Sequence, residues 1–493
     1  MQVVPYYPFF FVETAGADRG VKFDGFSARP QNPGKTRRRF APFRGKDDPG
    51  SVFVEPVDKQ RLRGSGKVFF QEPVERGFYP FSALYGKPGG FIDYYRNFIF
   101  MENFYVFHSD NYNMKKLFVL LFVIPVFAFA EPLHSPTWGF CVDLPEGYTY
   151  VDGDAKDRFS FAGPEGLMFE LIVYNGRYAS MLELANDVNK NISNKGEIDL
   201  FRYRDKNAVM IKLEFGKFTG WALGIEMDNL SDPKGPRPCL LALAYGSADK
   251  RNLDMFNMSA LDSIAPSFPD RYYPGPITEY CFPRGEAVKK NLALKGLSAM
   301  VYENDAKASQ EVIEREFRIM EAYLNTDLLR NACARYYRFI FRDSCDRIAD
   351  AAEAITRNLG GFTRGGVPVK DDAQKREFAQ KVLAFTQGFQ YERDLKGSDF
   401  INLVSAVTEG KGDCDSRAML FAIILAHAEI KSGIMLSHHY SHAMGLADIA
   451  GSGARFDSDG VKWLVAETTA KIDIGLIDQQ QSSPQHWFAI LFE

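Results

Sequence analysis

The sequence predicts an α+β protein, with an N-terminal module built on an antiparallel sheet, a helical connector and a C-terminal mixed domain. Between residues 138 and 264, short segments alternate apolar and polar residues, which is typical of half-buried strands. Beyond residue 306, apolar residues recur every three or four positions, which is typical of helices. With 493 residues, of which 46% are hydrophobic, the chain is long enough for two or three domains with ordinary cores.

Residues 1–113 differ in pattern from everything after them. Their Phe and Tyr residues follow neither a helical nor a strand period, so no face that could form a core is evident. A signal-peptide pattern follows at 114–130, with a charged start, an apolar middle and an Ala-x-Ala motif before Glu131. Because signal peptides stand at N-termini, we predict that translation begins at Met114 and that residues 1–113 come from a wrongly assigned upstream start. The alternative is a disordered N-terminal domain followed by a membrane-anchoring helix, which would need a longer apolar segment.

The signal peptide predicts a periplasmic or secreted protein that keeps no transmembrane anchor after cleavage. A formal net charge of -4 gives no electrostatic reason to expect nucleic acid as a partner. Export permits disulfides, but six cysteines in a chain of this length are too few for a disulfide scaffold. Apart from Cys414, we expect the cysteines to be buried structural thiols.

Residues 131–268 predict an α+β module. Phe140, Val142 and Leu144 alternate before a Pro-Glu-Gly turn, and helical patterns at 180–192 and 252–264 are predicted to cover one face of the sheet. Further strands are expected in "GLMFELIVY", "NAVMIKLEF", "TGWALGIEM" and "PCLLALAYG". This arrangement and the opening "GFCVDLPEGY" resemble the family of small secreted domains that includes the extrinsic oxygen-evolving subunit P of photosystem II. The module holds no cluster of ligands or nucleophiles, so we expect it to bind or to act as a spacer.

Residues 269–365 predict a linker followed by a helical region. Helical periodicity extends over 306–324 and 327–359, and "FRDSC" offers a helix-start signal that could divide the second segment. The arginines of this region could form an anion site, but a solvated helical face with internal ion pairs is the favoured interpretation. They are Arg330, Arg335, Arg338, Arg342 and Arg347.

In "GKGDCDSRAML", Cys414 lies between two acidic residues where a glycine-punctuated loop gives way to an apolar segment. The apolar segment predicts a buried helix with Cys414 in its first turn. Unpaired N–H groups at a helix start favour a thiolate and lower the pKa of the thiol, whereas Asp413 and Asp415 oppose that shift. Either aspartate, or Ser416, could instead cap the helix.

A base and an acid follow along the chain. His442 opens a predicted strand in "SHHYSHAMGLADI", and Glu467 ends the next predicted strand in "VKWLVAETTAKIDIG". Two adjacent antiparallel strands can place His442 and Glu467 side by side, facing the helix that carries Cys414. Thiol catalysis needs a nucleophile, a base and a group that orients the base.

These motifs resemble the transglutaminase-like superfamily, which has a papain-like fold, and we assign residues 366–493 to such a domain. The resemblance implies acyl transfer or hydrolysis on a peptide or carboxamide substrate by a triad of Cys414, His442 and Glu467. It also implies an oxyanion donor from "QGFQYERD", either Gln387 or Gln390. Glu467 stands where Asp is usual in the family, which changes the reach of the carboxylate.

Two alternatives stand beside this prediction. His438, His439 and His442, with Cys414, could bind a metal, but the chain has no second pair of ligands with typical spacing, so we predict neither a metal nor a cofactor. The second alternative is a non-catalytic binding or scaffold protein of the cell envelope that retains the fold. For an enzyme, the predicted partner is a peptide or protein substrate, and the predicted export suggests the cell envelope as its location.

Overall fold

Two sheets, of seven and five strands, together with the helices that separate them in the chain, account for most of the computed structural model. The structure describes residues 132–250, 253–393 and 397–492, all of which belong to one unit of the chain. The predictions for 1–113 and for the signal peptide at 114–130 lie outside these residues. Within them, no helix combines the length and the apolar composition that a membrane span requires. Antiparallel sheets and helices occur together, which confirms the α+β class.

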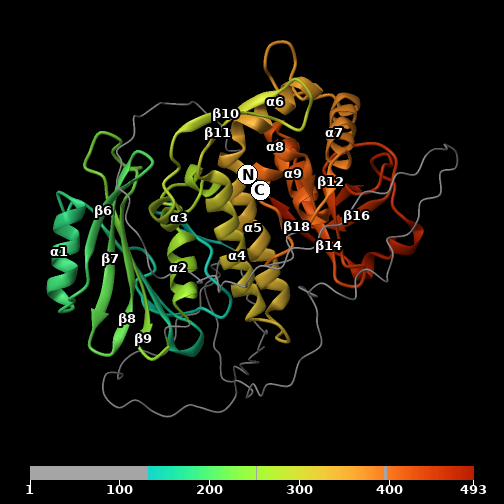
Figure 1. The fold of residues 1–493 in the computed structure, drawn as a ribbon. Helices are drawn as coiled ribbons and strands as arrows, with labels where there is room; N and C mark the ends of the chain where they lie inside the picture. The colour runs from blue at the N-terminus through green and yellow to red at the C-terminus, as the bar shows by residue number, and fades with distance from the viewer. Residues whose placement is uncertain (1–131, 251–252, 394–396, 493) are drawn as a thin grey trace, which may run out of the picture. The chain divides into compact units, whose positions relative to one another are not determined.

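In the seven-stranded sheet every neighbouring pair of strands is antiparallel. The helix α1 (Met181–Asn191) packs on one face and α2 (Asp254–Asp262) on the other, as Figure 1 shows. The prediction that both helices cover one face was therefore wrong. The central strand β9 is apolar on both sides, and an apolar face requires cover. The strands lie in the order β3 (Thr149–Gly153), β4 (Arg158–Ala162), β5 (Met168–Tyr174), β9 (Cys239–Ser247), β8 (Phe218–Glu226), β7 (Lys206–Phe215) and β6 (Ile198–Tyr203).

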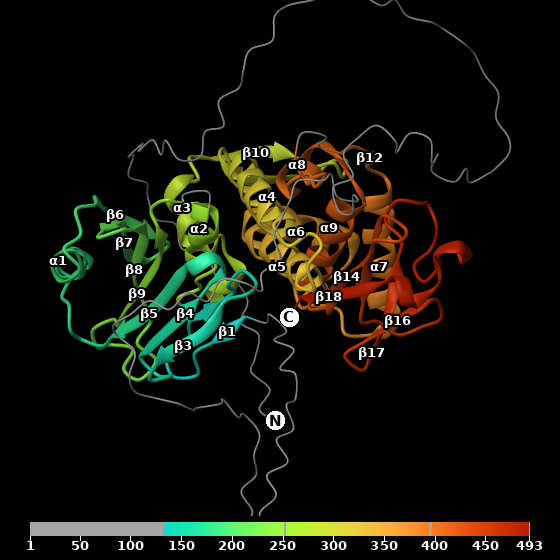
Figure 2. The ribbon, with the colours of Figure 1, turned by 90° about the horizontal axis from the view of Figure 1, so that it is seen from below.

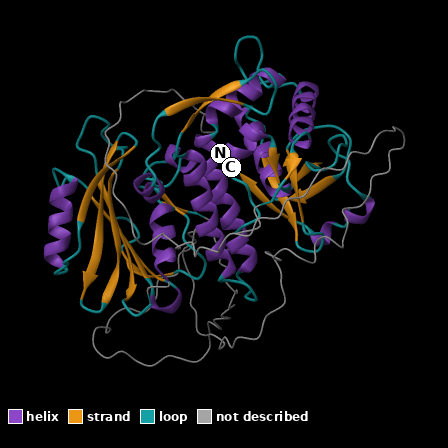
Figure 3. Ribbon diagram, in the orientation of Figure 1, coloured by secondary structure: helices purple, strands orange, loops and turns teal. Residues whose placement is uncertain are grey.

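The helical connector contains two long helices and several shorter elements. The predicted segment 327–359 is divided into two helices at Ile348, a few residues after the "FRDSC" signal. Figure 3 distinguishes these helices from the strands of both sheets. The elements are α3 (Pro276–Cys281), β10 (Ala287–Asn291), β11 (Ser298–Tyr302), α4 (Asp305–Glu321), α5 (Leu329–Arg347) and α6 (Ala349–Leu359).

The arginines of α5 do not form a solvated face, because Arg335, Arg342 and Arg347 are buried. The predicted internal ion pairs are present. Arg335 binds Glu316 of α4 at 2.6 Å and donates to Ser259 of α2 at 2.8 Å. These contacts join the sheet module to the connector, since α2 belongs to the former and α4 and α5 to the latter. Burial of a charged guanidinium costs free energy because the group loses its hydration, and the ion pairs offset this cost.

The last part of the chain packs two helices and a five-stranded antiparallel sheet around a third helix, α9, as Figures 1 and 2 show. One continuous apolar core includes residues of α4, α5 and α6 together with α9 and this sheet. The helices are α7 (Asp372–Gln387), α8 (Leu403–Glu409) and α9 (Cys414–His427). The strands lie in the order β16 (Arg455–Ser458), β17 (Val461–Ala466), β15 (His442–Ala447), β14 (Ser432–Ser437) and β18 (Phe488–Phe492).

A glycine allows α9 to approach this sheet closely. A Cβ atom added at Gly445 of β15 would lie 2.6 Å from the ring of Phe421 on α9. That is shorter than any normal carbon–carbon contact, so a larger residue would push the helix away. Gly445 thus keeps the strand that begins at His442 close to the helix that begins at Cys414.

Candidate active site

Cys414 is the first residue of α9, as predicted, and follows the short strand β13 (Lys411–Gly412). Of the three candidate caps, the structure uses Asp413, whose Oδ1 accepts a hydrogen bond from the backbone N–H of Ser416 at 2.8 Å and another from the Ser416 hydroxyl. A side-chain cap of this kind contributes about 1 kcal/mol to helix stability. The hydrogen bonds between Asp413 and Ser416 therefore fix the first turn of α9, and with it the backbone of Cys414.

A second strand supports the helix start. Tyr391 of β12 (Gln390–Tyr391) is the register partner of Gly412, two residues before Cys414, in a parallel pair. Ser416 also accepts a hydrogen bond from the backbone N–H of Ile401 at 3.0 Å. Segments distant in the chain thus hold the N-terminal turn of α9.

His442 and Glu467 are brought together as the strand pattern predicted. His442 begins β15, and Glu467 directly follows β17, which pairs with β15 in antiparallel register. The imidazole Nε2 lies 2.7 Å from Oε2 of Glu467. The other oxygen, Oε1, accepts hydrogen bonds from the backbone N–H and the hydroxyl of Thr469, at 2.7 and 2.6 Å. Both oxygens of the carboxylate are therefore fixed.

The protonation state of the pair follows from these contacts. Burial alone would raise the pKa of Glu467, but the hydrogen bonds from His442 and Thr469 bring this pKa below its ordinary value. Glu467 is therefore ionised at neutral pH and can only accept hydrogen bonds. Nε2 of His442 must then carry the hydrogen, which leaves Nδ1 as the basic nitrogen of the neutral ring.

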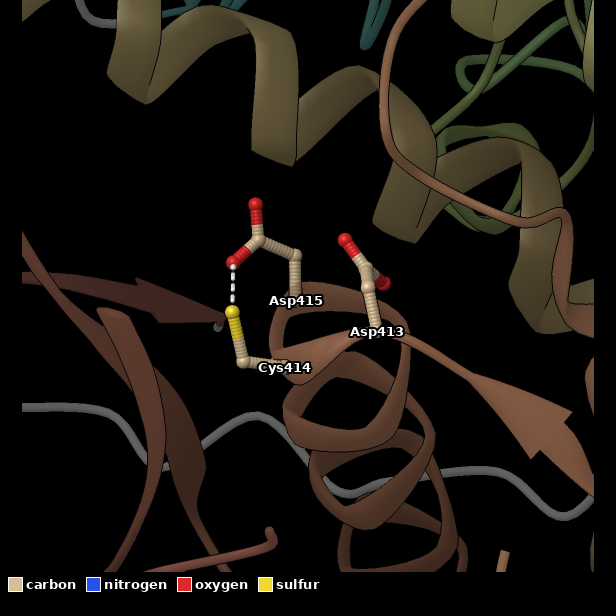
Figure 4. Close-up of side chains that lie close together, drawn as sticks. All are labelled: Asp413, Cys414 and Asp415. Carbon is tan, nitrogen blue, oxygen red and sulfur yellow. Dashed lines mark hydrogen bonds between the residues drawn. The ribbon is translucent and has the colours of Figure 1, made fainter. Parts of the chain in front are cut away.

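The thiol of Cys414 is bonded to its chain neighbour. Sγ donates to Oδ1 of Asp415 at 3.3 Å, as Figure 4 shows. Sγ also accepts a hydrogen bond from the backbone N–H of Ala443, the residue after His442. Among the described residues, no hydrogen bond joins Sγ to the His442 ring. The thiol and the imidazole are thus neighbours through Ala443, but they are not bonded to each other.

Burial and the charges of Asp415 and Asp413 raise the pKa of Cys414 well above its ordinary value, and the N–H of Ala443 only partly opposes this. The two opposing effects expected from the sequence are thereby resolved. Burial, together with the two carboxylates beside the thiol, raises the pKa of Cys414, and Cys414 is protonated at neutral pH.

The structure does not support a metal site formed by the three histidines with Cys414. Within the described ranges, the one group of three or more potential ligands is Asp413, Cys414 and Asp415, whose ligand atoms lie within 4.8 Å of one another (Figure 4). His438 and His439 do not belong to it. The ring of His439 instead stacks on that of His486, with centroids 4.1 Å apart.

The two predicted oxyanion donors have different surroundings. The amide of Gln387 donates to the backbone oxygens of Glu467 at 2.8 Å and Ile472 at 2.9 Å. Both of its N–H groups are thus used to hold the loop after Glu467, and neither is available for a substrate oxygen. Gln390 is exposed on β12, and its role as a donor stays a prediction.

Two residues that adjoin Cys414 or His442 were not predicted from the sequence. Tyr391 lies under the guanidinium of Arg417 at 5.5 Å, and the pKa of its hydroxyl is raised first by desolvation of this group and then by Cys414. Trp487 is buried and contacts the His442 ring edge-on, with centroids 6.3 Å apart. The position of Tyr391 next to Gln390 was the available signal for the first, whereas nothing in the sequence links Trp487 to His442.

Another thiol–imidazole contact lies in the N-terminal module. His134 of β1 (Leu133–His134) is the register partner of Cys141 of β2 (Cys141–Val142), and Nδ1 lies 2.9 Å from Sγ. Both residues line a cavity of about 120 Å³. Burial raises the pKa of Cys141 to about 11, and the thiol belongs to a residue that is 5% exposed. A buried thiol with a raised pKa fits the expected structural role of Cys141 better than the role of a nucleophile.

Comparisons with known proteins do not identify the chain. No protein-family model matches it, and no curated protein matches it. One similar solved structure is that of a Parabacteroides distasonis protein described provisionally as a protease. The two chains are 8% identical, with a TM-score of 0.17, over 63% of this chain and 69% of that one. Because so low a TM-score carries no argument, the function must be argued from the site itself.

Proposed function

We propose that this protein is an exported cysteine-dependent enzyme that transfers or hydrolyses the acyl group of a peptide or carboxamide substrate. Cys414 is the nucleophile, His442 the base and Glu467 the residue that orients the base. The hydrogen bond between His442 and Glu467, beside the helix start that carries Cys414, is the observation that supports this proposal most strongly.

The protonation states favour a general-base mechanism. Because the raised pKa of Cys414 keeps the thiol protonated, Sγ must lose its proton as it attacks the carbonyl carbon. Nδ1 of His442 accepts that proton, and the ionised carboxylate of Glu467 stabilises the resulting imidazolium. The backbone N–H of Cys414, at the helix start, is the proposed donor to the developing oxyanion.

The reaction is completed by a second acyl transfer. The imidazolium gives its proton to the leaving amine as the carbon–nitrogen bond breaks, which leaves a thioester on Cys414. Water then attacks the thioester in a hydrolase, or a second amine attacks it in a transferase, and His442 removes the proton of the attacking group. The thiol is regenerated in both cases.

The test is a screen of the full chain against a peptide library and a library of cell-wall peptide fragments. Turnover that is lost in both Cys414→Ala and His442→Ala is expected. Turnover that persists in Cys414→Ala would contradict the proposal.

The second candidate function is a non-catalytic envelope-binding or scaffold protein. Two observations favour it: the raised pKa of Cys414 and the hydrogen bond of its thiol to Asp415 instead of His442. Under this alternative, no substrate in the screen is turned over and the His442→Ala variant binds its partners as the unaltered chain does.

A further inference from the structure

Asp415 occupies a position between the proposed nucleophile and a buried tyrosine of another helix. Its Oδ1 accepts the thiol hydrogen of Cys414 at 3.3 Å, and its Oδ2 accepts the hydroxyl hydrogen of Tyr337 at 2.5 Å. Tyr337 lies on α5 and is fully buried, and Asp415 is 9% exposed. One carboxylate therefore connects Cys414 to the connector helices through two hydrogen bonds.

We propose that Asp415 is a positioning residue that holds the Cys414 thiol in a resting orientation, bonded to a carboxylate instead of to His442, and that Tyr337 fixes Asp415 in this role. The inference rests on the proposed function, because it concerns the regulation of the same site. In this proposal, the thiol must break its hydrogen bond to Asp415 before it can attack a substrate.

The step that this restraint opposes can be written with its protons. At rest, the proton is on Sγ and is directed to Oδ1 of Asp415. For attack, the S–H bond must leave Asp415 and turn toward Nδ1 of His442, which accepts the proton while Sγ bonds to the carbonyl carbon. Transfer of this proton leaves negative charge on sulfur beside the Asp415 carboxyl group, and the ionised form of this group repels that charge strongly in a buried site.

The other charged groups around the thiol do not remove this repulsion between the sulfur and Asp415. Asp413 adds a second carboxylate, and after burial the charges of Asp415 and Asp413 are the main causes of the raised thiol pKa. His442 and Arg393 favour the ionised form of Asp415 and so help to maintain its charge beside the thiol. The other titratable and charged groups that face this cluster include Cys333, Tyr336 and Tyr337 of α5, Tyr391 of β12, Arg417 of α9 and Asp399.

Tyr337 strengthens the restraint because it stabilises the charge of Asp415. Its hydrogen bond lowers the pKa of the Asp415 carboxyl, against the larger effect of burial, which raises it. Without the Tyr337 hydroxyl, Asp415 binds a proton more readily and repels a thiolate less. Tyr336 is the matched control, since it neighbours Tyr337 on the same buried helix but its hydroxyl bonds to Ser398.

The experiment measures how fast iodoacetamide alkylates Cys414 in the full chain between about pH 6 and about pH 10, by mass spectrometry of the peptide that contains Cys414. We expect Asp415→Asn to shift the apparent pKa of alkylation downward by about one unit or more, which is about a tenfold faster reaction at neutral pH. Tyr337→Phe should shift it in the same direction by less, and Tyr336→Phe should leave it unchanged.

An unchanged or upward-shifted profile in a folded Asp415→Asn variant would overturn the inference. If Asp415→Asn does not fold, Tyr337→Phe decides: a profile that coincides with that of Tyr336→Phe overturns the inference, and a downward shift supports it. Alkylation needs no substrate, so this result is separate from the proposed function. If the chain turns over no substrate but the alkylation profile shifts in Asp415→Asn, the inference about Asp415 holds and the proposed enzymatic function fails.

Discussion

His442 and Glu467 are joined by a hydrogen bond of 2.7 Å across two neighbouring antiparallel strands, although 24 residues separate them in the chain. The strand register and the contacts of Glu467 with Thr469 make this pairing rigid. Four predictions follow from the site and from the framework that holds it.

Replacement of the orienting acid should reduce turnover without unfolding the chain. Glu467→Gln keeps the shape of the side chain but removes the charge that stabilises an imidazolium, so we expect kcat to fall by about 10²–10⁴-fold. Glu467→Asp keeps the charge but withdraws it by one methylene, and it should also lower kcat because both oxygens are now fixed by contacts suited to Glu. Steady-state kinetics on a substrate from the screen measure both variants, and equal kcat in all three proteins would contradict this role.

The same carboxylate makes stability depend on pH. The pKa of Glu467 in the folded chain lies below its ordinary value of 4.5, so its contribution to stability is fully present above that value and is lost as the pH falls through the folded pKa. Urea denaturation from neutral pH to about pH 3 should therefore show the free energies of unfolding of the unaltered chain and of Glu467→Gln converging on acidification. A difference that stays constant over this range would exclude a lowered pKa.

Gln387 should matter for the loop that follows Glu467. Gln387→Ala removes two hydrogen bonds and leaves the buried backbone oxygen of Glu467 and the partly buried one of Ile472 without these donors, which should cost about 1–3 kcal/mol of stability. The control is Gln390→Ala, at an exposed position three residues on, where we expect a change within about 0.5 kcal/mol. Thermal or urea denaturation compares the two variants, and equal effects would show that Gln387 does not hold the loop.

The buried ion pair between α4 and α5 should be essential for stability. Arg335→Ala leaves the buried carboxylate of Glu316 without one of its cations, and removal of one partner of a buried pair typically costs about 3–5 kcal/mol. Arg330 lies on the same helix but is exposed, so Arg330→Ala is the matched control and should change stability by about 0.5 kcal/mol at most. If the two variants unfold at the same urea concentration, the network does not contribute as its burial suggests.

Local sequence patterns predicted where the helices and strands lie, but they did not predict which faces of these elements are buried. The apolar segment "PCLLALAYG" predicted β9 but did not reveal that both faces of the sheet are covered, because a period of two is nearly invisible when both sides are apolar. The arginines of α5 were predicted as a solvated face for a related reason. A helix whose buried side carries charged residues looks exposed in sequence, and only the partners Glu316 and Asp305, on another helix, show otherwise.

The same limit applies to the site. Cys414 at a helix start and His442 at a strand start could be predicted because capping residues and strand alternation are local signals. The balance of charges at the thiol could not, because it depends on how deeply Asp413 and Asp415 are buried. The link from Asp415 to Tyr337, 78 residues away, has no signal in a single sequence.

The central claim is that His442 removes the proton of the Cys414 thiol. Its most direct test is the rate at which iodoacetamide alkylates Cys414 at neutral pH in the unaltered chain and in His442→Ala. If His442 is the base, the variant should react at least about tenfold more slowly, with an apparent pKa shifted upward. Equal rates and equal pH profiles in the two folded proteins would contradict the claim.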